Sequence, residues 1–307
     1  MSSDPWKDLS SSLFRLHDVY YTDHVKMMSE SDFWTPGSPA AVESAREPYA
    51  GIWGEAPTRD AVVGVMLPLA AALDHLTALA TLLTSANTVY APFTVARSAI
   101  EIAAQTWYQL EPGIGAEERA VRYVNSRLRS LWEQEQLPGE DPRPDAEAIR
   151  TTSRRRMDAI IDSARSHKLE ARGRQNGRRP PAIGKGLKST SMLADPCISE
   201  TVPHLGALYW RVLSSTAHGQ QHGLVQSFTK ADPPAAPGTP GVSFGSLSLT
   251  VQQAALRTAG APMACLSMLD RFYTHVGWDD GTFRTARHAV LLTWSRIAGT
   301  TDPAMSA

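Results

Sequence analysis

The chain has 307 residues, of which 42% are hydrophobic and 20% charged, and its formal net charge is −1. These values are typical of a globular protein that can bury a sizeable core. The two cysteines, Cys197 and Cys265, exclude a disulfide scaffold and lack the Cys-x-x-Cys spacing of zinc and redox motifs. We expect both to be packing residues.

Two features of the sequence bear on localisation. The N-terminus, "MSSDPWKDLSSSLFRLHDVYY", lacks the basic start, apolar core and small-residue cleavage site of a secretory signal. The longest apolar run, "AVVGVMLPLAAALDHLTALATLL", is interrupted by Pro68, Asp74 and His75, which favours a buried helix over a membrane span. We therefore expect a cytoplasmic protein with no membrane partner.

The pattern of apolar residues predicts an all-α protein, an antiparallel helical bundle, with no sheet. Alanine and leucine dominate the apolar content, and alternating β-branched patterns are sparse. Residues 1–58 predict a short helix followed by an irregular N-terminal arm, and residues 59–300 predict a single bundle domain whose last two helices cover it or form a dimer surface. The expected helices span about 59–86, 90–111, 115–136, 144–170, 203–227, 248–276 and 280–299, with a short one beginning near Ser191.

Two segments between these helices have distinctive compositions. Residues 171–190 are rich in glycine, proline and cations, which predicts a loop, and the prolines of residues 230–241 predict a linker. Residues 150–188 hold twelve Lys or Arg against three acids, although the whole chain is nearly neutral. One end of the molecule should therefore attract anions.

Three of the predicted helices carry a narrow polar stripe. The stripes are Asp74, Thr77, Thr81 and Ser85; Thr94, Arg97, Ser98, Glu101 and Gln105; and Arg211, Ser215, His218 and His222. The first two helices are otherwise mostly apolar, and buried polar groups need partners, so we expect the three stripes to face each other and line a polar cleft. Arg97 and Glu101, four residues apart, are predicted to form a buried ion pair.

The third stripe lies in "YWRVLSSTAHGQQHG", residues 209–223. A solvated helix face is one interpretation. Against it, the stripe lacks lysine and glutamate and consists of groups that transfer protons or bind oxyanions. This favours a reaction centre at Arg211 and His218, surrounded by Ser214 and Ser215.

Six residues separate Arg211 from His218, and this spacing in a helical context resembles the Arg-x4–6-His motif of the HEPN ribonuclease superfamily of toxins and defence proteins. The chain is also similar to bacterial helical proteins that share a motif of the form Tyr-x-Arg-x-Leu-Ser-x-x-x-His-Gly. That motif is matched by Tyr209, Arg211, Leu213, Ser214, His218 and Gly219.

The resemblance implies a metal-independent endoribonuclease that needs no cofactor and binds RNA. In it, His218 would move the proton of the ribose 2′-hydroxyl or of the leaving oxygen, and Arg211 would hold the phosphate. It also implies a homodimer with two motifs across a two-fold axis. Active members usually carry a polar residue after the arginine, whereas this chain has Val212.

Two other hypotheses remain open. His218 and His222, four residues apart, could bind a metal ion with Glu101 or Asp74 from facing helices, as in a metal-dependent bundle enzyme. Alternatively, the chain is a non-enzymatic binding or regulatory protein whose polar cleft takes a small anion or a partner segment, with Arg211 and Arg97 as anion ligands.

Overall fold

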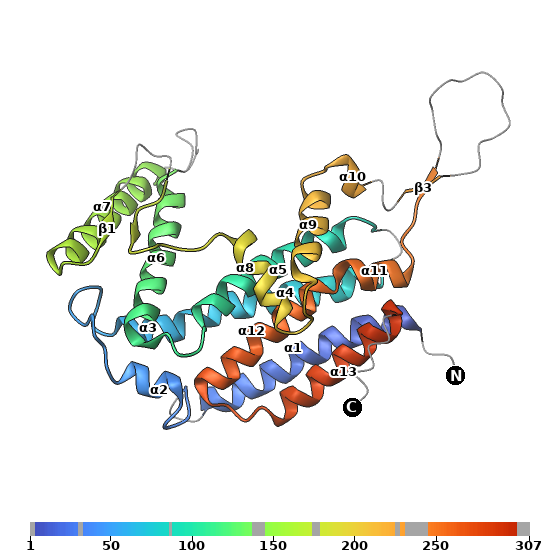
Figure 1. The fold of residues 1–307 in the computed structure, drawn as a ribbon, viewed down its shortest axis with the longest axis horizontal. Helices are drawn as coiled ribbons and strands as arrows, with labels where there is room; N and C mark the ends of the chain where they lie inside the picture. The colour runs from blue at the N-terminus through green and yellow to red at the C-terminus, as the bar shows by residue number, and fades with distance from the viewer. Residues whose placement is uncertain are drawn as a thin grey trace, which may run out of the picture.

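The computed structural model describes residues 4–29, 33–85, 88–136, 145–173, 179–224, 228–230 and 245–299, and it confirms the all-α prediction (Figure 1). The helices, in chain order, are α1 (Pro5–Ser29), α2 (Pro39–Ser44), α3 (Pro57–Gly64), α4 (Met66–Leu83), α5 (Ala91–Gln109), α6 (Gly115–Glu135), α7 (Ala146–Ser166), α8 (Thr190–Ser199), α9 (Gly206–Ala217), α10 (Gln221–Leu224), α11 (Val251–Thr258), α12 (Gly260–Val276) and α13 (Gly281–Ala298).

Two short antiparallel strand pairs correct the expectation of no sheet. The strands β1 (Ala171–Arg172) and β2 (Ala182–Ile183) pair within the segment predicted to be a loop. The strands β3 (Phe228–Lys230) and β4 (Gly245–Leu247) flank the predicted linker, most of which lies outside the described residues. Strands of two or three residues are too short to show an alternating pattern in the sequence.

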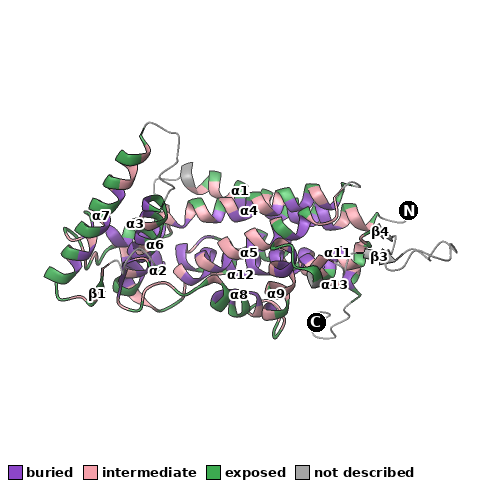
Figure 2. Ribbon diagram, turned by 90° about the horizontal axis from the view of Figure 1, so that it is seen from above, coloured by how far each residue is buried: buried purple, intermediate pink, exposed green. Residues whose placement is uncertain are grey.

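The centre of the larger core is formed by α5 and α12. Helix α5 packs against α4, α8, α9 and α12, and Figure 2 shows the buried residues gathered along these helices. Helix α12 is apolar around most of its circumference, which is the signature of a buried helix. It therefore lies at the centre of the bundle, which corrects the prediction that this helix covers the bundle or forms a dimer surface.

The N-terminal segment also differs from the expected short helix and arm. Helix α1 has 25 residues, and its Leu9, Leu13 and Leu16 are fully buried against the same core. It packs along α4 and α13, where Trp294 Nε1 donates a hydrogen bond of 3.0 Å to Ser12 Oγ. Among the described residues of this segment, only 33–56, interrupted by α2, form an irregular arm.

One stretch, Pro57–Leu83, is long and apolar enough to cross a membrane. Core helices of soluble proteins pass the same test, so this is weak evidence for a membrane span. The stretch is divided at Val65 into α3 and α4, and Leu69, Leu73 and Leu76 of α4 are fully buried in the larger core.

A second, smaller hydrophobic cluster lies between α6 and α7. It contains Val124, Leu128, Met157, Ile161 and Ile183 among its buried residues. The two helices stand at one end of the elongated molecule, on the left in Figure 1. Ile183 belongs to β2, so the cluster also anchors the β1–β2 hairpin, which carries much of the positive charge.

Candidate functional site

Helix α9 has one buried face and one outward face, and it carries the predicted catalytic pair on the outward face. Leu213 and Thr216 are buried, whereas Arg211 and His218 are exposed. Leu208, 58% exposed, lies one turn before Arg211 on the same side. Ser214 is half-buried beside this face, and Ser215 is buried, with its hydroxyl donating to Val212 O at 2.8 Å. Arg211 and His218 therefore share one open stripe, two helical turns apart.

The helix ends at this stripe, which corrects the expected helix over residues 203–227. His218 is the C-cap residue, and Gly219 follows with φ of +65°, a left-handed conformation that suits glycine. Gln220 N then donates to Ser215 O at 2.9 Å, which closes the turn. His222 belongs to the separate helix α10, so the two histidines do not share a helix face; the His222 side chain lies outside the described residues.

The ion pair on α5 is confirmed, but it is only partly buried. Arg97 Nη2 lies 2.6 Å from Glu101 Oε1, and the two side chains are 20% and 34% exposed. The Arg97 guanidinium lies 5.2 Å from the ring centre of Trp210 of α9. Arg97 Nε is buried without a hydrogen-bond acceptor among the described residues. Helix α9 thus covers one side of the pair and leaves the other open to solvent.

The polar stripe of α4 faces solvent, so the three stripes do not line one shared cleft. Asp74 is exposed. The hydroxyls of Thr77 and Thr81 donate to Leu73 O and Thr77 O within the same helix, both at 3.1 Å. Because a threonine can bond to its own preceding turn, the stripe needs no polar partner from another helix. The prediction of a common cleft is therefore wrong for Asp74.

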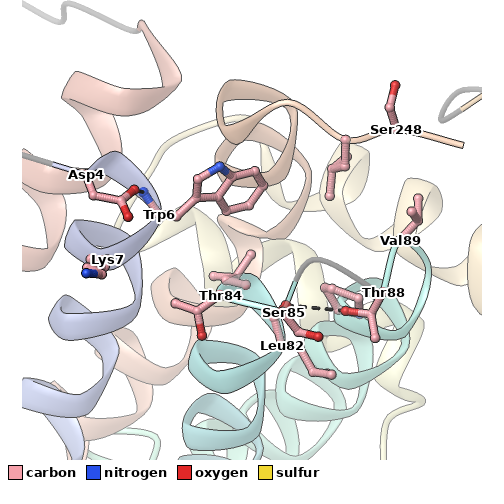
Figure 3. A pocket seen from close by; sticks show the side chains of 12 residues that line it. Asp4, Trp6, Lys7, Leu82, Thr84, Ser85, Thr88, Val89 and Ser248 are labelled. Carbon is pink, nitrogen blue, oxygen red and sulfur yellow. Dashed lines mark hydrogen bonds between the residues drawn. The ribbon is translucent and has the colours of Figure 1, made fainter.

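A cavity of about 440 Å³ lies at the end of α4, where α1 begins (Figure 3). Trp6, Lys7 and Ser85 line it, together with residues of the segments 88–92 and 248–249. Ser85 is the last residue of the α4 stripe. Apart from Ser85, no described residue of the three polar stripes lines this cavity, so it does not join the α9 stripe into a larger site.

The two cysteines are packing residues, as predicted. Cys197 and Cys265 are fully buried, and Cys197 Sγ donates to Ala264 O at 3.7 Å. Burial raises the pKa of both thiols, which keeps them protonated and unreactive. In the part of the chain that the structure describes, no three His, Cys, Asp or Glu side chains are placed to hold a metal ion.

One cluster of cationic side chains is not predicted by the sequence. Arg129 of α6 joins Arg172, Arg179 and Lys185 of the hairpin region around a separate cavity of about 210 Å³. The excess charge of residues 150–188 signals three of these cations. Nothing local signals that Arg129, more than forty residues before Arg172, lies with them.

The fold and the site thus define an all-α protein with an open arginine and histidine stripe on one helix and a separate cationic cavity. No family model matches the chain. Searches of curated proteins and of solved structures also find no match.

Proposed function

We propose that the protein is a HEPN-like, metal-independent ribonuclease of the toxin or defence type, acting in the cytoplasm, with Arg211 and His218 as its catalytic residues. One observation supports this proposal above the others: both side chains lie on the outward face of α9 and make no hydrogen bond or ion pair with the described residues. A cation and an imidazole without partners are free to bind a phosphate and to move a proton.

In the proposed reaction the 2′-oxygen of a ribose attacks the adjacent phosphorus, and the bond from phosphorus to the 5′-oxygen breaks. A neutral imidazole accepts the proton of the 2′-hydroxyl, and a protonated imidazole donates one to the departing 5′-oxygen. The products are a 2′,3′-cyclic phosphate and a 5′-hydroxyl. The Arg211 guanidinium offsets the charge that develops on the phosphoryl oxygens.

The reaction uses two imidazoles, and among the side chains that the structure describes the stripe of one chain supplies only His218. We therefore propose a homodimer in which the outward faces of two α9 helices meet, each bringing one Arg211 and one His218. Leu208 supports this arrangement. Its side chain is 58% exposed beside the site, and burying a leucine against a partner stabilises the dimer. Arg97 and Glu101, joined to α9 through Trp210, would hold the orientation of the helix.

The test is cleavage of a single-stranded RNA carrying a fluorophore and a quencher, in buffer with EDTA. We expect cleavage by the wild-type protein, and a loss of at least about a hundredfold in rate in His218→Ala and in Arg211→Ala. His288→Ala, which removes an exposed histidine from α13, and Arg155→Ala, which removes an exposed arginine from α7, should cleave at the wild-type rate.

Two results would contradict the proposal. One is the absence of cleavage at any protein concentration. The other is cleavage that survives His218→Ala, since a contaminating nuclease would behave in this way. Light scattering provides an independent check, because a monomer at all concentrations would leave the site without its second imidazole.

A non-enzymatic role is the second candidate, and Val212 favours it. Val212 stands where active HEPN members usually carry a polar residue, and its carbonyl accepts from Ser215 and Thr216, so the segment packs as an ordinary helix. Binding of the labelled RNA that depends on Arg211 but leaves the strand intact would select this role.

A further inference from the structure

A cavity of about 210 Å³ lies between α6 and the β1–β2 hairpin. Four cationic side chains line it, from Arg129, Arg172, Arg179 and Lys185, and no acidic side chain does so among the described residues. Cations gathered around a hollow repel each other unless an anion lies between them. The cavity is therefore a candidate site for an anionic ligand.

Most of these cations have no internal partner. Arg172, Arg179 and Lys185 are exposed, and the structure gives their side chains no hydrogen bond or ion pair with a described residue. Arg129 Nε lies 2.6 Å from Glu133 Oε1, and both side chains are more than half exposed. An ion pair this exposed contributes little, so Arg129 can turn to a ligand at small cost.

The backbone at the floor of the cavity is held in place by hydrogen bonds and packing, whereas charges on a solvated surface have no such support. Asn125 of α6, buried, donates through Nδ2 to Ile183 O at 3.0 Å and accepts through Oδ1 from Ile183 N at 2.8 Å. Ile183 is in turn packed in the smaller core. Arg172 Nη2 lies 3.6 Å from the position that a Cβ on Gly186 would take, so the guanidinium lies beside the turn that follows β2.

A second cavity of about 410 Å³ adjoins the first, and Arg129 and Leu187 line both. It lies along α6, facing α5 and the segment 187–190. Its polar lining consists mainly of hydroxyl and amide side chains. These include Gln105, Tyr123, Ser126, Ser130, Ser189 and Thr190. Glu133 is its one acidic residue among those described. Such a lining suits a neutral organic group with many hydroxyls.

We propose that the two cavities together bind a phosphate monoester of a hydroxyl-rich small molecule, the chemistry shared by sugar phosphates and nucleotides. The phosphate lies among the four cations, where guanidinium groups donate in pairs to its oxygens. The organic part lies along α6 in the larger cavity. Their combined size falls within the roughly 300–1,000 Å³ of small-molecule sites.

The test is isothermal titration calorimetry of the full chain with inorganic phosphate and with ribose 5-phosphate. We expect ribose 5-phosphate to bind more tightly, because only it fills both cavities. The double variant Arg172→Ala/Lys185→Ala should weaken its binding by about tenfold or more. The matched control Arg155→Ala/Arg156→Ala removes the same charge from exposed positions of α7 and should change the affinity little.

A further variant separates the two halves of the site. Ser130→Trp places a large side chain in the larger cavity from an exposed position, so it should abolish the advantage of ribose 5-phosphate and leave the binding of inorganic phosphate unchanged. Titration with adenosine 5′-monophosphate distinguishes the two sources, since tighter binding than ribose 5-phosphate assigns a nucleotide and equal or weaker binding assigns a sugar phosphate.

Three results would overturn the proposal. These are the absence of saturable binding at millimolar concentrations, equal affinity for phosphate and ribose 5-phosphate, and an equal loss in the control variant. An RNA oligonucleotide without terminal phosphates provides a further check. If it binds more tightly than ribose 5-phosphate and loses affinity equally in both double variants, the basic surface attracts nucleic acid in general. The proposal does not rest on α9, so His218→Ala should bind ribose 5-phosphate as the wild type does.

Discussion

At the scale of single residues, Arg119 is the most deeply buried charged side chain among the described residues, with 1% of its surface exposed. Its Nε and Nη2 donate to the carboxylate of Glu43, and the guanidinium also donates to Gln109 O and Glu111 O. These contacts tie α2 and the end of α5 to α6. Burying an ion pair costs free energy because both charges lose their hydration. Removing one partner costs more, because the other charge then remains buried without a counter-charge.

We therefore predict that Arg119→Met lowers the free energy of unfolding by about 3–5 kcal/mol, because it leaves the Glu43 carboxylate buried without its partner. The double variant Arg119→Met/Glu43→Met should lose less than Arg119→Met alone. Arg284→Ala, which breaks an exposed pair with Asp280, should cost less than about 1 kcal/mol in the same urea titrations. A double variant less stable than the single one would contradict this account.

His275 makes stability depend on pH. Burial, reinforced by the nearby Arg119, lowers its pKa to about 3 from an unfolded value of 6.5. The Glu43 carboxylate lies 4.0 Å from His275 Nε2, but Arg119 already balances its charge. Below pH 6.5 the unfolded chain thus binds a proton that the folded chain does not, so acid favours unfolding down to about pH 3, by at most about 1.4 kcal/mol per pH unit.

The measurement is the free energy of unfolding of the wild type and of His275→Gln between about pH 7.5 and about pH 4.5, on either side of the pKa of an unfolded histidine. We expect the wild type to lose more stability on acidification than the variant, whatever their difference at neutral pH. Parallel curves would mean that His275 binds a proton as readily in the folded protein as in the unfolded chain, which would contradict the lowered pKa.

These residue-scale features differ in how far the sequence predicts them. The ion pair of Arg97 and Glu101 follows from their spacing on one helix, and the structure contains it. The pair of Arg119 and Glu43 joins positions 76 residues apart, so only the tertiary fold creates it. For the same reason the sequence indicates the excess of cations in residues 150–188 but not the place of Arg129 beside them.

At the scale of elements, α9 is placed by the close approach of backbones at its start. A Cβ on Gly206 would come 2.4 Å from Asp195 O of α8, which is too close for any side chain. The same aspartate accepts from Ala207 N through Oδ1 at 2.8 Å. Glycine therefore fixes the distance between α8 and α9, and with it the position of the outward stripe.

We predict that Gly206→Ala destabilises the protein by about 1–3 kcal/mol, because α9 must move away from α8. Gly219→Ala, at φ of +65° with open space around it, should cost about 1 kcal/mol through backbone strain alone. Thermal unfolding measures both losses. The tryptophan fluorescence, to which Trp210 contributes, should change in Gly206→Ala and stay unchanged in Gly219→Ala. A change in Gly219→Ala alone would show that the contact at Gly206 does not position α9.

Helix existence was predictable from periodicity, whereas helix breaks and partners were not. The predicted helices over 90–111 and 115–136 agree closely with α5 and α6, which end at short connections. The break after α9 depends on the conformation of Gly219, a residue that helices also tolerate internally. The prediction that the three polar stripes face each other is wrong for α4, because the threonine hydroxyls of α4 donate to carbonyl groups of their own helix.

At the scale of the whole molecule, the two hydrophobic clusters support different proposed sites. The larger core holds α9, while the smaller one holds the hairpin and its cations. Contacts between α6 and the helices α2, α3 and α5 connect the two. We therefore expect that the stability of the part that holds the proposed catalytic stripe and the stability of the part that holds the proposed phosphate site can be altered separately.

Met157, fully buried on α7 in the smaller core, provides the test of this division. We predict that Met157→Ala costs about 2–4 kcal/mol locally and speeds amide hydrogen exchange in α6, α7 and β2, while α12 keeps its protection. Met268→Ala, at a fully buried position of α12, should instead speed exchange in α5, α9 and α12. Hydrogen exchange with mass spectrometry resolves these segments. If each variant speeds exchange equally throughout, the two clusters unfold as one unit, and a ligand bound at the hairpin would then protect α9 as strongly as α7.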